Sequence, residues 1–242
     1  MVDTHAHINP RELTDVDAKI KEINELEYLK YVINVGLDYE TSKYSIELSN
    51  REEKFYSVIG IHPLYEGTLE SISELYDQSD SSKIVGIGET GLDNSSDLEL
   101  QESKFHESID LANNTHLPLV IHSNNTNYEC IRIIKSHKPK HGFVFHCFQP
   151  NLEVLDYIME MGGFISVGTP ITRVNAKKSL EVIKNVDINQ LLIELDYPFM
   201  SEDTMKDGKN VFNRIRELRG FEFKELEYIL DNNAKRLFRR MK

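Results

Sequence analysis

The chain contains little cysteine, proline and glycine. Of its 242 residues, 2 are Cys, 7 are Pro and 12 are Gly. So little Pro and Gly excludes a collagen-like or low-complexity chain, and two cysteines, Cys130 and Cys147, cannot form the disulfide framework of a small secreted protein. A reducing compartment fits this composition, and we expect a cytoplasmic protein.

Long hydrophobic runs are also missing. No apolar run approaches the roughly 18 residues of a membrane span. The first residues, from Met1 to His5, include neither the basic segment nor the apolar core of a signal peptide. We therefore expect neither membrane insertion nor secretion through a cleaved signal.

Cationic side chains are outnumbered by anionic ones. The chain has 28 Lys and Arg against 40 Asp and Glu, which gives a formal net charge of −12. A field of this sign disfavours the approach of a polyanion at long range. Any function that acts on phosphate groups must therefore supply positive charge locally.

Short runs rich in β-branched and aromatic residues alternate with longer amphipathic segments, which is typical of a parallel α/β sheet. Successive runs start 22 to 35 residues apart, enough for a strand, a crossover helix and two loops. Helical spacing of apolar residues predicts helices over 97–114, 151–161, 211–219 and 221–242. We predict an α/β fold of the (β/α)8 TIM barrel type, a single domain over residues 1–242, with a doubly wound sheet as the alternative. The eight runs begin near Val2, Tyr31, Phe55, Ile84, Leu119, Gly142, Phe164 and Leu191.

Polar residues stand at the C-terminal ends of these runs, where barrel enzymes bind their ligands. His5 and His7 are two positions apart, so their side chains share one face of a strand. One such histidine alone is more often structural, but charged groups gathered in a half-buried site repel one another and are costly to desolvate. Divalent cations are the simplest remedy. The set comprises His5, His7, His62, Glu89, His122, His146, Glu194 and Asp196.

This set has too many members for one catalytic zinc ion, which usually takes three protein ligands. It suits two divalent metal ions about 3.5–4 Å apart that share a carboxylate. We expect Glu89 to be shared, with one ion on His5, His7 and Asp196 and the other on His122 and His146. Imidazole ligands favour Zn, Mn, Ni or Co over Mg, and the identity of the ions stays open.

Four residues near the expected centre have further predicted roles. Asp196 is expected to accept a proton from the attacking water, with capping of the chain segment that follows it as the alternative. His62 is expected either to bind a phosphate oxygen of the substrate or to seat the loop at Pro63. Glu194 is expected to orient a ligand histidine, and Cys147 to point away from the site into the packing.

Two bound dications would reverse the field of the protein locally. The net charge then favours a short strand end that enters a pocket over an extended groove for duplex DNA. Four cationic residues are interpreted as parts of solvated helix faces, with contact to substrate phosphate as the alternative. They are Arg173, Lys177, Lys178 and Lys209.

At these residues the chain resembles the TatD family of metal-dependent deoxyribonucleases. The most specific matching segment is Gly88-Glu89-Thr90-Gly91-Leu92-Asp93, and the others lie at 3–7, 60–63, 121–123, 146–148, 193–198 and 233–238. The resemblance implies a (β/α)8 barrel with a dinuclear site that hydrolyses phosphodiester bonds in DNA, often as a 3′-to-5′ exonuclease on single strands. DNA would then be the substrate, with no obligate protein partner. By position, the implied ligands are His5, His7, Glu89, His122, His146 and Asp196.

Four positions depart from the family pattern. Asn9 stands where the family usually has Asp, Leu64 where a second histidine is common, and Leu195 where Thr is usual. Asn124 stands where an arginine is usual, so a cation that would meet substrate phosphate is replaced by an amide. None of these changes removes a predicted ligand.

Two other functions compete with the nuclease. The first is an amidohydrolase-type enzyme that cleaves small ester, amide or aminoacyl substrates. Many such enzymes bridge their metals with a carboxylated lysine after the fourth strand, whereas this chain has Glu89 there. The second is a catalytically silent barrel that serves as a binding protein.

Overall fold

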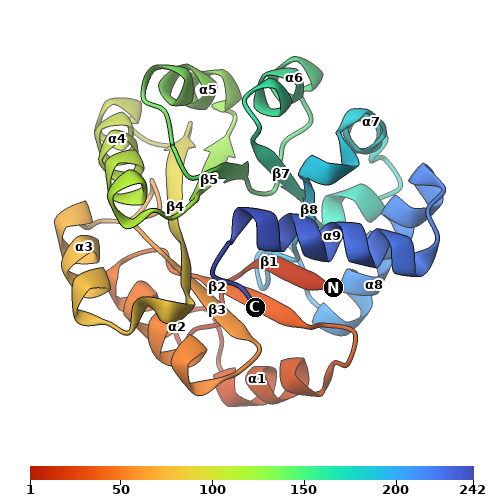
Figure 1. Ribbon diagram of the computed structural model, residues 1–242, viewed down its shortest axis with the longest axis horizontal. Coiled ribbons are helices and arrows are strands. Elements are labelled where there is room, and N and C mark those ends of the chain that lie inside the picture. Colours follow the sequence, from red (N-terminus) through yellow and green to blue (C-terminus); the bar gives the residue numbers. More distant parts are fainter.

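Eight parallel strands form one sheet in the order β1 to β8, with helices around it (Figure 1). The computed structural model describes residues 1–242, except for the side chain of Met205. The predicted (β/α)8 TIM barrel is confirmed, and the doubly wound alternative is wrong. The strands are β1 (Val2–Ala6), β2 (Tyr31–Val35), β3 (Phe55–Ile59), β4 (Ile84–Asp93), β5 (Leu119–Asn124), β6 (Phe143–Phe145), β7 (Phe164–Val167) and β8 (Leu191–Ile193).

Short polar side chains cap most of the α-helices at their N-termini. The carboxylate of Asp38 accepts from the N–H of Thr41, and the Thr41 hydroxyl accepts from the N–H of Asp38, which together form a capping box. Asp203 accepts from the N–H of Lys206 in the same way, so α8 begins well before the predicted residue 211. The helices are α1 (Val16–Glu25), α2 (Tyr39–Arg51), α3 (Leu69–Gln78), α4 (Leu98–Thr115), α5 (Asn127–Ser136), α6 (Leu152–Glu160), α7 (Lys177–Asn185), α8 (Thr204–Arg219) and α9 (Phe223–Leu237), with short 3₁₀ turns η1 (Ser81–Lys83), η2 (Thr169–Thr172) and η3 (Ile188–Gln190).

The barrel closes between its first and last strands. The Thr4 hydroxyl donates to the carbonyl of Ile193 at 2.9 Å. Beyond β8, the N–H of Asp196 donates to the carbonyl of His5 at 2.9 Å, and the N–H of His7 donates to the carbonyl of Tyr197 at 2.7 Å. This seam brings the segment after β8 alongside His5 and His7.

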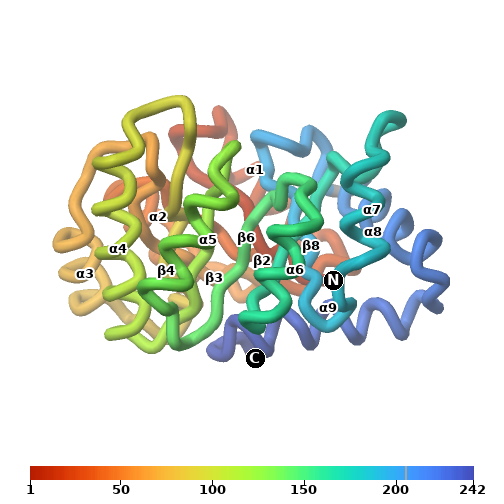
Figure 2. Tube along the Cα trace, turned by 90° about the horizontal axis from the view of Figure 1, so that it is seen from above, coloured from red at the N-terminus to blue at the C-terminus, as the bar shows by residue number. Residues whose placement is uncertain are grey.

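One end of the barrel is covered by α9, which runs along the lower edge in Figure 2. Leu237 and Phe238, at its C-terminal end, belong to the same buried cluster as the barrel residues Val58, Val120 and Leu192. Because α9 covers this end, the site must form at the other end, beyond the strand C-termini. None of the helices in the described part of the chain has the length and apolar character that a membrane span requires.

Candidate metal centre

Inside the barrel, a layer of apolar side chains is followed by a layer of polar side chains toward the C-terminal ends of the strands. Val120 and Val144 are buried in the cluster beneath α9. Two positions further along the same strand paths lie His122 and His146. Because side chains two residues apart on a strand share a face, both imidazoles lie above the packed interior. Glu194 stands in the same relation to Leu192.

Asp196 reaches the centre through the seam between β1 and the segment after β8. Its backbone is in the left-handed region with a φ of 48°, and its N–H is held by the carbonyl of His5. The carboxylate Oδ1 then lies 3.4 Å from the Nε2 of His7. The contact joins two residues that are 189 positions apart in the sequence.

Glu89 lies at the middle of the centre, and its side chain is 3 % exposed. Its two oxygens face different histidines. Oε2 lies 3.2 Å from the Nε2 of His5 and 3.6 Å from that of His7. Oε1 lies 2.8 Å from Nδ1 of His122, 2.7 Å from Nε2 of His146 and 3.6 Å from Nε2 of His62. One carboxylate therefore divides five imidazoles into a pair and a group of three.

In His7, His122 and His146, the outer ring nitrogen, which is the one that points away from Glu89, faces an oxygen atom. The Nδ1 of His7 lies 2.9 Å from the carbonyl of Val35, which can only accept, so His7 carries its proton there. The Nδ1 of His146 faces Oε1 of Glu194 at 3.7 Å, and Ser166 donates to the other oxygen of that carboxylate. A neutral imidazole protonated on its outer nitrogen turns a lone pair toward Glu89, as metal-binding histidines do.

His122 is held from outside by Asp93. The Nε2 of His122 lies 2.9 Å from Oδ2 of Asp93. Burial would raise the pKa of Asp93, but the bonds from Ser95, His122 and Asn124 bring it to about 2, so this carboxylate accepts the proton of His122. The Nδ1 of His122 faces Oε1 of Glu89 at 2.8 Å. A ring nitrogen and a carboxylate oxygen at that separation require a proton or a cation between them.

His62 has the opposite tautomer. Its Nδ1 accepts from the N–H of Leu64 at 3.2 Å, so the proton lies on Nε2, which faces the centre. Burial lowers the pKa of His62 to about 4, which keeps the ring neutral. The two roles expected for His62 are thus compatible, since one nitrogen holds the loop at Pro63 while the other is left as a donor toward the site.

The electrostatics of the centre depend on the charge of Glu89. Burial alone would raise its pKa, but the surrounding histidines, with His146 foremost, hold the pKa well below its usual value. Burial and the nearby ring of His146 lower the pKa of His5. For Asp196, burial opposes ionisation, but the nearby imidazoles, with His7 foremost, prevail and its pKa is lowered. Burial would lower the pKa values of His146 and His7, but the neighbouring carboxylates raise both. The centre thus gathers ionised carboxylates and basic imidazoles, the two donor types that divalent metal ions bind in such sites.

These donors fit a divalent cation in number and in chemistry. The Nε2 atoms of His5 and His7 lie 3.1 Å apart, close enough to bind one ion. Oδ1 of Asp196, buried beside them, accepts no hydrogen bond. Three groups in the described residues have ligand atoms within 4.8 Å of one another: His5, His7 and Asp196; His5, Glu89 and His146; His62, Glu89 and His122.

The structure brings the predicted histidines and carboxylates of the centre together and adds one residue that was missed. Asp93, which orients His122, lies four positions after Glu89 within β4, inside the segment that carries the family resemblance. Glu89 was expected at the end of its strand, but β4 continues to Asp93 with a register shift between Ile87 and Thr90.

One expectation about the residues near the site is wrong, and one alternative is excluded. Cys147 was expected to point into the packing, but its backbone has a φ of 42°, which breaks the alternation, and its side chain lines a cavity beside the centre. Lys209 was a candidate phosphate contact, but its Nζ lies over the ring of Tyr28 beside Met1, where β1 begins, away from the strand C-termini.

Three of the four departures from the family pattern make hydrogen bonds that hold the local structure. Asn9 accepts from the N–H groups of Arg11 and Glu12 and so closes a turn. Leu195 is buried, and its N–H donates to Asp3. The Asn124 amide donates to Oδ2 of Asp93 at 3.1 Å, so it supports the carboxylate that holds His122.

Comparison with known proteins gives a consistent result over the whole chain. A family model described as TatD related DNase matches residues 2–239. The metal-dependent hydrolase YabD of Bacillus subtilis is 33% identical, over 99% of this chain and 99% of its own length. The crystal structure of YjjV, a TatD homolog from Escherichia coli, superposes with a TM-score of 0.87 at 26% identity, over 99% of this chain and 98% of that one. A TatD family hydrolase from Entamoeba histolytica shares the fold, with a TM-score of 0.84 at 20% identity, over 100% of this chain and 98% of that one.

Proposed function

The chain belongs to the TatD-related family of metal-dependent hydrolases, and from this premise we propose that it hydrolyses phosphodiester bonds at single-stranded ends of DNA. The observation that carries the proposal is the division of the Glu89 carboxylate, with two imidazoles at one oxygen and three at the other. Such an arrangement suits a pair of cations, and paired cations are typical of enzymes that displace a group at phosphorus.

Each oxygen of Glu89 defines one proposed ion position. His5, His7 and Asp196 would hold the first ion with Oε2, because their ligand atoms lie together at the seam. His122 and His146 would hold the second ion with Oε1, which both approach within 2.8 Å. His62 is excluded from the proposed ligands, because a protonated Nε2 has no lone pair to give.

A bound pair of divalent cations supplies acidity to a water molecule and offsets the negative charge of the phosphate oxygens. Asp196 is the proposed acceptor of the proton from that water, since its carboxylate is ionised and its Oδ1 accepts no hydrogen bond. His62 is the proposed donor to a phosphate oxygen, because its Nε2–H faces the same space as a neutral hydrogen-bond donor.

The surroundings of the centre favour a single strand over a duplex. Arg173, Lys177 and Lys178 are exposed in the segment that follows β7, where they could meet the phosphates of a short strand. The ring of Phe199, which is 52% exposed, lies 5.1 Å from that of His7. An exposed aromatic ring next to a catalytic centre offers a surface on which an unpaired base can stack.

The proposal is tested with purified protein supplied with Mn²⁺ or Mg²⁺. End-labelled oligonucleotides, single-stranded and duplex, are incubated with the wild type and with Glu89→Gln as the inactive control. We expect mononucleotides to be released from the single strand and Glu89→Gln to release none. Cleavage of small esters or amides with the single strand left intact would favour the amidohydrolase alternative. A wild type that retains no divalent ion and cleaves nothing would favour a binding protein.

A further inference from the structure

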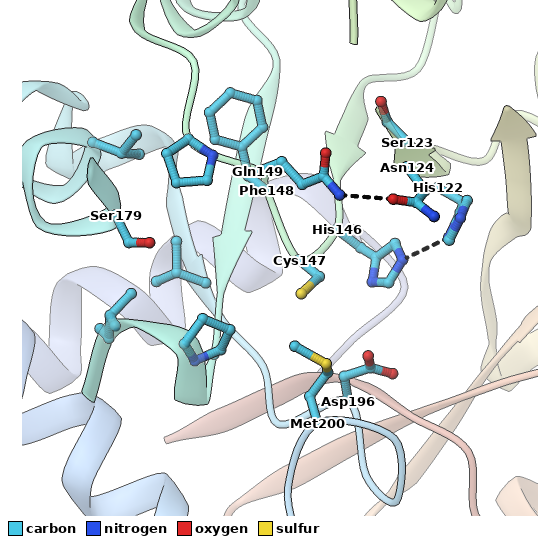
Figure 3. A pocket seen from close by; sticks show the side chains of 16 residues that line it. His122, Ser123, Asn124, His146, Cys147, Phe148, Gln149, Ser179, Asp196 and Met200 are labelled. Carbon is cyan, nitrogen blue, oxygen red and sulfur yellow. Dashed lines mark hydrogen bonds between the residues drawn. The ribbon is translucent and has the colours of Figure 1, made fainter. Parts of the chain in front are cut away.

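A cavity of about 270 Å³ lies directly beside the proposed metal centre. His122, His146 and Asp196 form its wall on the side of the centre. Figure 3 shows the hydroxyl of Ser179, the sulfur of Cys147 and the side chain of Met200 around the same space. The cavity is therefore continuous with the place where the reaction is proposed to occur.

The remaining walls of this cavity are mostly apolar. They come from the end of β7, from the segments after β6, β7 and β8, and from α7, so the cavity lies between the barrel rim and one outer helix. Apolar walls with a few polar groups are typical of sites that bind an uncharged organic group. The apolar lining residues are Phe148, Pro150, Val167, Pro170, Ile171 and Val182.

The lining is unsuited to phosphate. Lys and Arg are absent from the described residues that line the cavity, and Asp196 adds a negative charge at its inner end. A phosphate desolvated there would meet no cationic partner away from the metal centre. The group that enters the cavity is therefore expected to be uncharged.

Polar groups at the edge of the cavity can pair with the rim of a flat ring. The Gln149 amide donates to Oδ1 of Asn124 at 2.9 Å and accepts from the N–H of Asn125 at 3.0 Å, so its orientation is fixed. A primary amide has two N–H groups, so a second N–H of Gln149 can meet a ligand. The hydroxyl of Ser179 faces the space from α7 (Figure 3).

We propose that this cavity binds one nucleobase of the substrate, the base next to the bond that is cut. The inference rests on the proposed function and names the part of the DNA that this site recognises. The volume is slightly below the range of about 300–1,000 Å³ typical of pockets for drug-sized ligands, which suits one base. A base has apolar faces for the walls and a polar edge for Gln149 and Ser179.

The test uses Ser179→Phe, which fills the cavity from a half-buried position on α7 without removing a ligand of the centre. Ser73→Phe is the matched control, because Ser73 is a half-buried serine on the outer helix α3. Two single-stranded substrates are compared, one with a normal 3′-terminal nucleotide and one with an abasic residue there. Stacking of one base on an aromatic side chain, which Phe148 offers in this cavity, is worth about 5- to 150-fold in affinity.

We expect the wild type and Ser73→Phe to prefer the normal end over the abasic end by about tenfold or more in kcat/KM. In Ser179→Phe this ratio should fall close to one. Equal use of both ends by the wild type would overturn the inference and leave the nuclease intact.

A binding measurement separates this inference from the proposed reaction. Deoxyadenosine, which has no phosphate, is titrated into the three proteins by calorimetry. Binding to the wild type and to Ser73→Phe, with loss in Ser179→Phe, supports the cavity as a base site even if no oligonucleotide is cleaved. Absence of binding to the wild type, or equal binding to all three proteins, would overturn the inference.

Discussion

Asp93→Asn removes the charge that orients His122 and leaves every proposed ligand in place. The carboxylate accepts from His122 and Asn124 on Oδ2 and from Ser95 on Oδ1, at distances of 2.6–3.1 Å. A carboxamide has one accepting oxygen and one donating NH₂ group. In Asp93→Asn the NH₂ group must therefore face either His122 and Asn124 or Ser95. On that side, the NH₂ group would meet hydrogen-bond donors in place of acceptors.

The magnitude follows from the role of groups that support a metal ligand. Their removal typically lowers metal affinity or activity by about 10- to 100-fold, which corresponds to about 1.4–2.7 kcal/mol. Because bonds from its neighbours bring the pKa of Asp93 to about 2 against the effect of burial, the wild-type carboxylate is ionised from about pH 5 upward. The loss should therefore appear at every pH at which the enzyme is assayed.

The assay is a titration with Mn²⁺, followed by calorimetry, together with kcat/KM on single-stranded DNA. The matched control is Asp97→Asn, because Asp97 caps the exposed start of α4 and Asn caps a helix equally well. We expect Asp97→Asn to behave as the wild type. If Asp93→Asn bound Mn²⁺ within about twofold of the wild type and cleaved DNA equally fast, Asp93 would have no orienting role.

Three further predictions concern Glu89, His62 and Asp38. Glu89→Ala should abolish hydrolysis, and the variant should still unfold cooperatively in a thermal melt, because a residue at the barrel rim contributes little to the core. Near wild-type turnover of this variant with added Mn²⁺ would refute the ligand assignment. His62→Ala should lower kcat by about 10²- to 10³-fold with its metal content unchanged, whereas loss of an ion would identify His62 as a ligand. The carboxylate of Asp38 pairs with the guanidinium of Arg11 at 2.6 Å. Burial opposes ionisation of Asp38, but this pair and the hydrogen bonds from Thr41 lower its pKa. The pair therefore stabilises the fold above about pH 4, and this contribution is lost as the pH falls through the folded pKa. Asp38→Asn should then cost about 0.5–1 kcal/mol in urea unfolding at pH 7, and the cost should shrink as the pH falls below about 4. A cost that stays constant from pH 7 to pH 2 would contradict this assignment.

Strand alternation made part of the centre predictable. His122 and His146 come two positions after buried valines, so their inward direction follows from the period of a strand. Glu89 was predicted as a ligand, but its place inside β4 was not, because the register shift between Ile87 and Thr90 is a tertiary feature. The orienting role of Asp93 could have been inferred from its spacing of four from Glu89 on one strand.

The other features of the site could not be predicted, because they depend on local backbone conformation and on how the barrel closes. Alternation failed at Cys147, since its positive φ turns the side chain into the cavity. The contact of Asp196 with His7 depends on the seam between β1 and the segment after β8, which no local pattern specifies. The position of Lys209 likewise depends on how α8 packs beside Tyr28. The presence of cationic residues on a helix therefore did not predict at which end of the barrel they lie.

The central claim is that Glu89 shares its two oxygens between two divalent cations. Crystals grown with Mn²⁺ and measured on both sides of the manganese absorption edge would locate these ions directly. We predict two anomalous peaks about 3.5–4 Å apart, one beside Oε2 with His5, His7 and Asp196 and one beside Oε1 with His122 and His146. A single peak, or peaks away from Glu89, would contradict the account.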